Sequence, residues 1–143
     1  MKNQEINKNK FDSSTGQDPV VFSHRFYKYK REWYKVLKHW KKMSEEGFYS
    51  GEKPVSVKCA FCKRFCNFVG SAYFHPCGRC PIYKHTGRSY CGETPYNDVY
   101  DMWDYLDHMH RGDITEDMLA NYKNLCTIMY EWLLELHKEY QTE

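Results

Sequence analysis

Two pairs of cysteines with the spacing C-x2-C most constrain the structure that this chain can form. The pairs are Cys59/Cys62 and Cys77/Cys80, with 14 residues between them. Each pair can present two sulfurs from one tight turn, and two pairs together supply the four tetrahedral ligands that Zn²⁺ prefers. The sequence therefore predicts a structural zinc site.

The full set of zinc ligands stays open, because further cysteines lie within reach. Cys91 is the strongest additional donor and could replace Cys77, whereas Cys66 is a weaker candidate. The run from Cys59 to Cys66 matches part of a ferredoxin spacing, which leaves an iron–sulfur cluster as a second hypothesis. The predicted zinc ligands are Cys59, Cys62, Cys80 and one of Cys77 or Cys91.

The cysteines and the apolar pattern also predict a cellular compartment. The N-terminal residues lack the apolar segment of a secretory signal, and no apolar run approaches the roughly 20 residues of a membrane span. We therefore expect a cytoplasmic protein outside the membrane, where paired cysteines more often bind metal than form disulfides. The seventh cysteine, Cys126, lies within a predicted helix and is expected to be a buried thiol.

Three segments carry apolar residues at alternating steps of three and four, which is the period of an amphipathic helix. The first runs from the start signal Asp18-Pro19 to Gly47, a residue suited to a helix end. The second opens at Thr94-Pro95, and the third opens at a predicted capping box over residues 113–116.

These signals predict a mainly α fold with two long helices and one shorter helix. A single domain over 18–143 would contain a basic helix over 18–47 and a helical hairpin over 94–140. Between them, residues 55–92 have no long period and are predicted to form an inserted, irregular zinc module that the metal holds together. Residues 1–17 are polar, and we expect them to form a flexible tail.

Charge divides the chain into a basic and an acidic half. Residues 1–91 contain 18 Lys and Arg against 7 Asp and Glu, whereas residues 92–143 contain 3 against 12. The favoured interpretation is that the two halves pack together and neutralise each other. The alternative is a basic face for nucleic acid, since the first helix interleaves tyrosines with basic residues. The residues of that alternative surface are Lys28, Lys30, Arg31, Lys35, Lys38, Lys41 and Lys42.

The cysteine motifs resemble those of small cysteine-rich proteins of tailed bacteriophages, a group with no established activity. The shared pattern runs C-x2-C, then C-x2-C-P, then C-x2-T-P-Y, and it covers about 40 of the 143 residues. The resemblance implies a phage origin and zinc as the metal. It also implies five recurrent positions, which are Cys59, Cys62, Cys77, Cys80 and Cys91.

No catalytic motif accompanies the cysteines. The sequence lacks the phosphate loop G-x4-G-K-[ST], the zinc-protease motif H-E-x-x-H and the nucleophile turn G-x-S-x-G. We therefore expect a protein that is not an enzyme. The predicted function is that of a non-catalytic, zinc-stabilised phage interaction protein that acts on a host protein in the host cytoplasm. The alternative is a nucleic-acid-binding module that uses the basic first helix.

Overall fold

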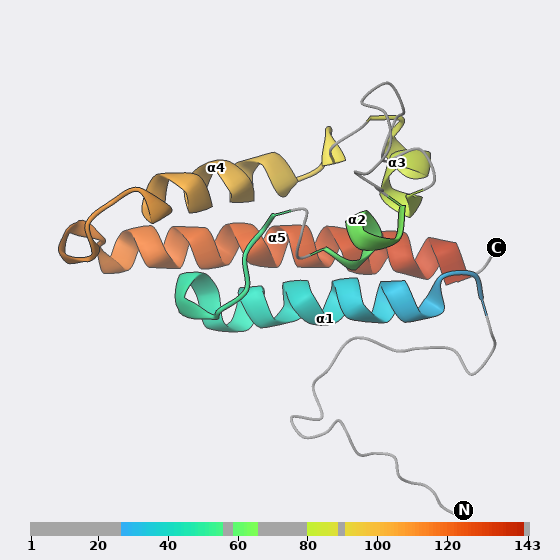
Figure 1. Ribbon diagram of the computed structural model, residues 1–143, viewed down its shortest axis with the longest axis horizontal. Helices are drawn as coiled ribbons and strands as arrows, with labels where there is room; N and C mark the ends of the chain where they lie inside the picture. The colour runs from blue at the N-terminus through green and yellow to red at the C-terminus, as the bar shows by residue number, and fades with distance from the viewer. Residues whose placement is uncertain (1–26, 56–58, 66–79, 89–90, 142–143) are drawn as a thin grey trace, which may run out of the picture.

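The computed structural model describes residues 27–55, 59–65, 80–88 and 91–141 (Figure 1). The predicted mainly α fold is confirmed, and no strand occurs within these ranges. The predicted tail over 1–17 lies outside the described residues. The elements are α1 (Lys30–Glu46), the short 3-10 helix η1 (Gly47–Tyr49), α2 (Ala60–Phe65), α3 (Pro81–Thr86), α4 (Tyr96–Asp107), the 3-10 helix η4 (Arg111–Asp113) and α5 (Glu116–Gln141).

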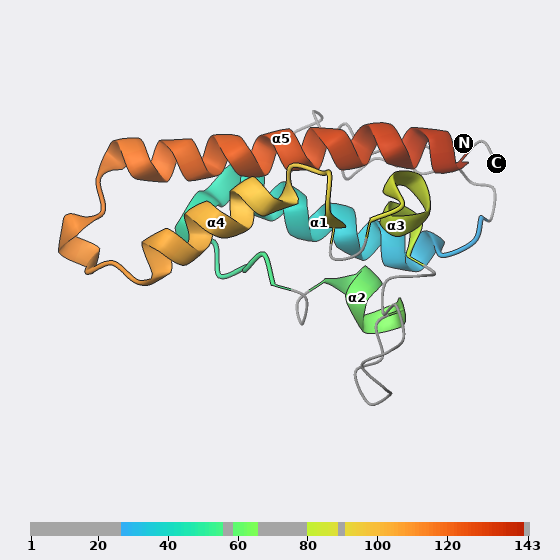
Figure 2. The same cartoon turned by 90° about the horizontal axis from the view of Figure 1, so that it is seen from above.

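The long helix α5 is the centre of the fold. It runs antiparallel to α1 along one side and antiparallel to α4 along another, as Figures 1 and 2 show from two directions. The short helices α2 and α3 lie near the C-terminal end of α5, and α2 packs against α1. The cysteine-bearing segments are therefore held at one end of a helical scaffold.

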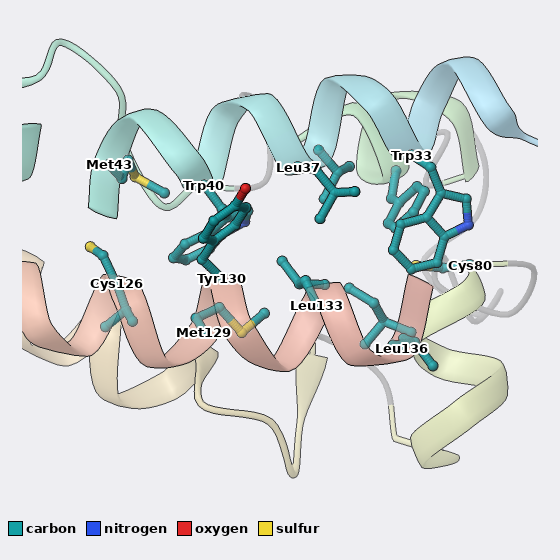
Figure 3. Packing of buried hydrophobic residues seen from close by; sticks show 14 of the residues in the cluster. Trp33, Leu37, Trp40, Met43, Cys80, Cys126, Met129, Tyr130, Leu133 and Leu136 are labelled. Carbon is teal, nitrogen blue, oxygen red and sulfur yellow. The ribbon is translucent and has the colours of Figure 1, made fainter. Parts of the chain in front are cut away.

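Apolar side chains fill the space between α1 and α5. The stripe predicted for the first helix is buried from Trp33 to Met43, as the helical period requires. Figure 3 shows these side chains pointing toward those of the facing helix, which include Cys126, Met129, Leu133 and Leu136. Val99 and Leu106 of α4 and Phe61 of α2 are also fully buried, so each of these helices is anchored in the same core.

The first helix begins later than the sequence predicts. Tyr29 has a left-handed backbone with φ 64°, and α1 starts at Lys30, so the helix predicted over 18–47 does not continue through Tyr29. Residues 18–26 lie outside the described residues. Two contacts explain the break: the Tyr27 hydroxyl lies 2.6 Å from His137 Nε2, and the Tyr29 ring meets Phe65 edge to face. These tertiary contacts override the local helical period.

The end of α1 and the start of α5 follow local backbone chemistry. Gly47 has φ 76° and its N–H donates to the Met43 carbonyl, which ends α1 where the glycine predicts. The cap of α5 is Thr115, whose Oγ1 accepts the Met118 N–H at 3.1 Å. The capping box predicted over residues 113–116 is therefore wrong by two positions, because Arg111–Asp113 instead forms η4.

Helix α5 is 26 residues long and carries several polar side chains. No helix in the described ranges is both long and apolar enough to cross a membrane.

Candidate functional site

The first cysteine pair lies at the start of α2. Cys59 precedes the helix and its carbonyl accepts the Lys63 N–H at 2.9 Å, which places Cys62 within the first turn. The Cys62 thiol hydrogen-bonds to the Cys59 sulfur and is the main reason that the pKa of Cys59 is lowered to about 7. The two sulfurs of this predicted pair are therefore brought together, and Cys59 ionises more readily than an ordinary thiol.

Phe61 fixes this pair to the scaffold. Phe61 stands between the two cysteines in the sequence, and its side chain is fully buried. Its ring meets the Trp33 ring edge to face, with 4.9 Å between the centroids. An aromatic pair of this geometry adds roughly 1 kcal/mol beyond the burial of its area. The backbone of α2 therefore holds its position through the core as well as through any metal.

Cys91 lies in a tight turn that leads into α4. Its φ is 59°, and its carbonyl accepts the Thr94 hydroxyl at 2.8 Å. Thr94 Oγ1 in turn accepts the Tyr96 N–H at 3.0 Å, so one side chain closes the turn and starts the helix. The C-x2-T-P-Y motif thus has a structural meaning: it orients the cysteine relative to α4.

The Tyr96 side chain connects this turn to the first cysteine pair. Its hydroxyl donates to the Pro54 carbonyl at 2.6 Å. Burial raises the pKa of the Tyr96 phenol, and the nearby thiols of Cys91, Cys62 and Cys59 raise it further. Three of the five predicted cysteines therefore act on the pKa of one phenol. The sequence places Tyr96 at the end of the C-x2-T-P-Y motif and in the apolar stripe of the second helix, but it shows no sign of the contact with Pro54.

The second predicted pair is only partly described. Cys80 is buried and precedes α3, where its carbonyl accepts the Lys84 N–H at 3.0 Å. Cys77 and the weaker candidate Cys66 lie outside the described residues. In the ranges that the structure describes, no group of three or more Cys, His, Asp or Glu side chains is gathered as a metal site. The zinc centre therefore stays a prediction.

The donor chemistry that is described fits zinc. The Cys59/Cys62 pair supplies adjacent sulfurs, and the positive charge of Lys63 helps to lower the pKa of Cys59. Thiolates are the ligands that structural zinc sites use most. The residues that would hold the ion are Cys59, Cys62 and Cys80, with Cys91 or Cys77 as the fourth.

Cys126 differs from these cysteines in both burial and chemistry. Its side chain is fully buried in the core between α1 and α5, and burial raises the pKa of its thiol to about 11. It is therefore a neutral core residue, as its position in the helical stripe predicts.

The basic residues predicted on the first helix divide into two groups. Lys28, Arg31, Lys35 and Lys38 are exposed, whereas Lys30, Lys41 and Lys42 are half-buried. Only some of them line a groove of about 540 Å³ between α1, α2 and the segment after η1. We call this the basic groove, and its lining residues are Glu32, Lys35, Lys38, His39, Lys42, Glu52, Ala60, Lys63 and Arg64.

Lys63 and Arg64 join this groove because α2 packs against α1, a contact between segments about 30 residues apart. The sequence marks both residues only as basic neighbours of the cysteines. Their proximity to the lysines of α1 depends on Phe61 being buried beside Trp33, which the periodic pattern does not reveal.

No protein-family model, curated protein or solved structure matches this chain. The resemblance of its cysteine motifs to small phage proteins therefore stays a prediction.

Proposed function

We propose that this chain is a non-catalytic, zinc-stabilised interaction protein, encoded by a bacteriophage, that binds a host protein in the host cytoplasm. The observation that carries the proposal is the outward face of α4. Tyr100 is 37% exposed and Tyr105 is 57% exposed, and both flank Asp101 and Asp104 on the side of the helix away from α5. We call these four residues the α4 face.

One aromatic ring of the α4 face, that of Tyr100, is ordered by its neighbours. The Tyr100 ring stacks on Tyr96 at 6.1 Å between centroids and lies 6.0 Å from the Trp103 ring. Ordered tyrosines bind a partner with little loss of side-chain entropy, and Tyr and Trp are enriched among residues that dominate binding energy. The two aspartates favour a partner with a basic patch, because complementary charge speeds association.

In this proposal the zinc ion has a structural role. It would join α2, α3 and the turn at Cys91 and so fix the start of α4, on which the α4 face lies. Metal binding of this kind contributes directly to folding. No catalytic group is required, and the partner would be recognised by shape, aromatic contact and charge.

Affinity purification from the host, followed by binding measurements with the purified partner, tests the proposal. Tyr105→Ala should weaken binding at least about tenfold, since a central aromatic residue of an interface contributes 2 kcal/mol or more. Tyr34→Ala is a matched control, because Tyr34 is 49% exposed but lies on α1 rather than on α4. A partner that binds both variants and the wild type with equal affinity would contradict the proposal.

A second candidate function is nucleic-acid binding through α1. It is favoured by the basic groove, which gathers cations from two helices rather than from one. Binding of this kind must weaken steeply as the salt concentration rises, because neutralised phosphates release their counterions. A protein partner held by the α4 face would show a much weaker dependence on salt.

A further inference from the structure

We propose that the basic groove binds the phosphate backbone of a single-stranded nucleic acid over a few nucleotides. This proposal rests on the second candidate function, and it assigns that function to one place on the molecule. The residues that would contact phosphate are Lys35, Lys38, Lys42, Lys63 and Arg64.

The positive charges of the groove come from two directions. Lys35, Lys38 and Lys42 follow one another along one face of α1, and the rise from the first to the last is about 10 Å. This length corresponds to about three nucleotides of a strand that keeps the 3.4 Å spacing of a duplex. Lys63 and Arg64 lie in the last turn of α2, so a strand in the groove would meet cations from two helices.

The acidic groups of the groove are already engaged. Glu32 lies 3.6 Å from Arg64, and Glu52 lies 2.6 Å from His39 Nδ1 and 4.0 Å from Lys42. Glu32 and Glu52 thus orient three basic side chains without neutralising the whole site. None of the ion pairs among the described residues uses Lys35, Lys38 or Lys63. The groove therefore has a surplus of positive charge, and a concave surface concentrates its field.

An exposed tyrosine next to the groove provides a surface for a base. Tyr34 is 49% exposed, and Lys38 Nζ lies 5.9 Å from the centre of its ring. Proteins that bind single strands combine a basic channel with aromatic rings on which bases stack. A groove of about 540 Å³ has the size of a small-ligand site. This size suits a short piece of one strand, whose bases are free to stack, rather than a duplex.

The test measures fluorescence anisotropy of a labelled 12-nucleotide oligothymidylate with the full chain, starting at about 50 mM salt, where the counterion effect is strong. The double variant Lys35→Glu/Lys38→Glu removes two groove cations. It should lower the affinity at least tenfold and reduce the slope of log K against log salt by about 1.4, which is two phosphate contacts at 0.7 each. Tyr34→Ala should weaken binding and leave this slope unchanged.

The matched control is Lys28→Glu/Arg31→Glu, which makes the same change of charge outside the groove, at Arg31 in α1 and at Lys28 just before this helix. It should keep most of the affinity. Both variants replace exposed residues, and circular dichroism with zinc analysis checks that each is folded.

The possible results test binding at the groove and nucleic-acid binding in general separately. If the wild type binds no oligonucleotide, both the groove proposal and the second candidate function are wrong. If the two double variants lose affinity equally, the groove is overturned, whereas nucleic-acid binding by the whole basic helix stands. If a duplex or a poly-glutamate chain of equal charge binds as tightly as the single strand, the assignment to single-stranded nucleic acid is overturned.

Discussion

His137 should make the protein lose stability in mild acid. Its side chain is 2% exposed, and burial lowers its pKa from an ordinary 6.5 to about 4. The Tyr27 hydroxyl lies 2.6 Å from Nε2, and the Trp33 ring lies 4.9 Å away, so an added charge would sit among aromatic groups. The folded protein therefore disfavours the protonated imidazole.

The sign and size of the effect follow from the two pKa values. The unfolded chain binds a proton at His137 below pH 6.5, whereas the folded chain binds it only near pH 4, so stability is lost as the pH falls between these values. The loss from this one group is about 2 kcal/mol between pH 7 and pH 5, and about 3 kcal/mol by pH 4. Above pH 6.5 its contribution is constant.

Urea unfolding of wild type and of His137→Gln at pH 7, 6 and 5 measures this loss, since glutamine keeps a polar group but does not titrate. The variant should be less stable at pH 7, yet it should lose about 2 kcal/mol less than the wild type between pH 7 and pH 5. His110→Gln is the control, because His110 is exposed. Any metal that leaves in acid would leave all three proteins alike, since neither substitution is at a cysteine. Parallel loss of stability in wild type and His137→Gln would refute the reasoning.

Three further outcomes concern the cysteines and their turn. Protein purified without added metal should contain close to one zinc ion per chain. The Cys59→Ser variant should lose the zinc ion, and the Cys126→Ser variant should retain it. A brown, iron-containing protein would contradict the zinc prediction. After metal removal, iodoacetamide should modify Cys59 well before Cys126, because the pKa values of the two thiols are about 7 and about 11. The rate at Cys59 should rise as the pH passes through about 7. Equal rates for the two cysteines would count against the described burial of Cys126. Tyr96→Phe should lower the free energy of unfolding by about 1–3 kcal/mol in thermal or urea unfolding, since it leaves the Pro54 carbonyl without its donor, and Tyr100→Phe, at an exposed position, should have little effect.

The sequence predicts well those parts of the fold that depend on local pattern. Trp33, Val36, Trp40 and Met43 recur at helical spacing, and all are buried against α5 because any helix with such a stripe must cover it. Gly47 ends α1 because glycine can adopt the positive φ of 76° that the end of this helix requires.

Features that depend on contacts between distant segments were not predictable in this way. The break at Tyr29 is caused by His137 and Phe65, which lie far away in the chain. The zinc module was predicted to be irregular, yet its described parts contain α2 and α3. Both helices are short, and their few buried residues, such as Phe61 and Ile82, give too little periodicity for a sequence pattern to detect.

The hydrogen bond between Tyr96 and Pro54 has a consequence for how this protein can change in evolution. It joins residues 42 positions apart, one just before the first cysteine pair and one just after Cys91. The two ends of the cysteine-rich segment are therefore held together, so that the segment is a closed loop that is also anchored to the core through Phe61. Doubling the length of such a loop adds only about 0.6 kcal/mol to the entropy of closing it. Changes of chain length between α2 and α3 can therefore accumulate, and the packing of α1, α4 and α5 need not change with them.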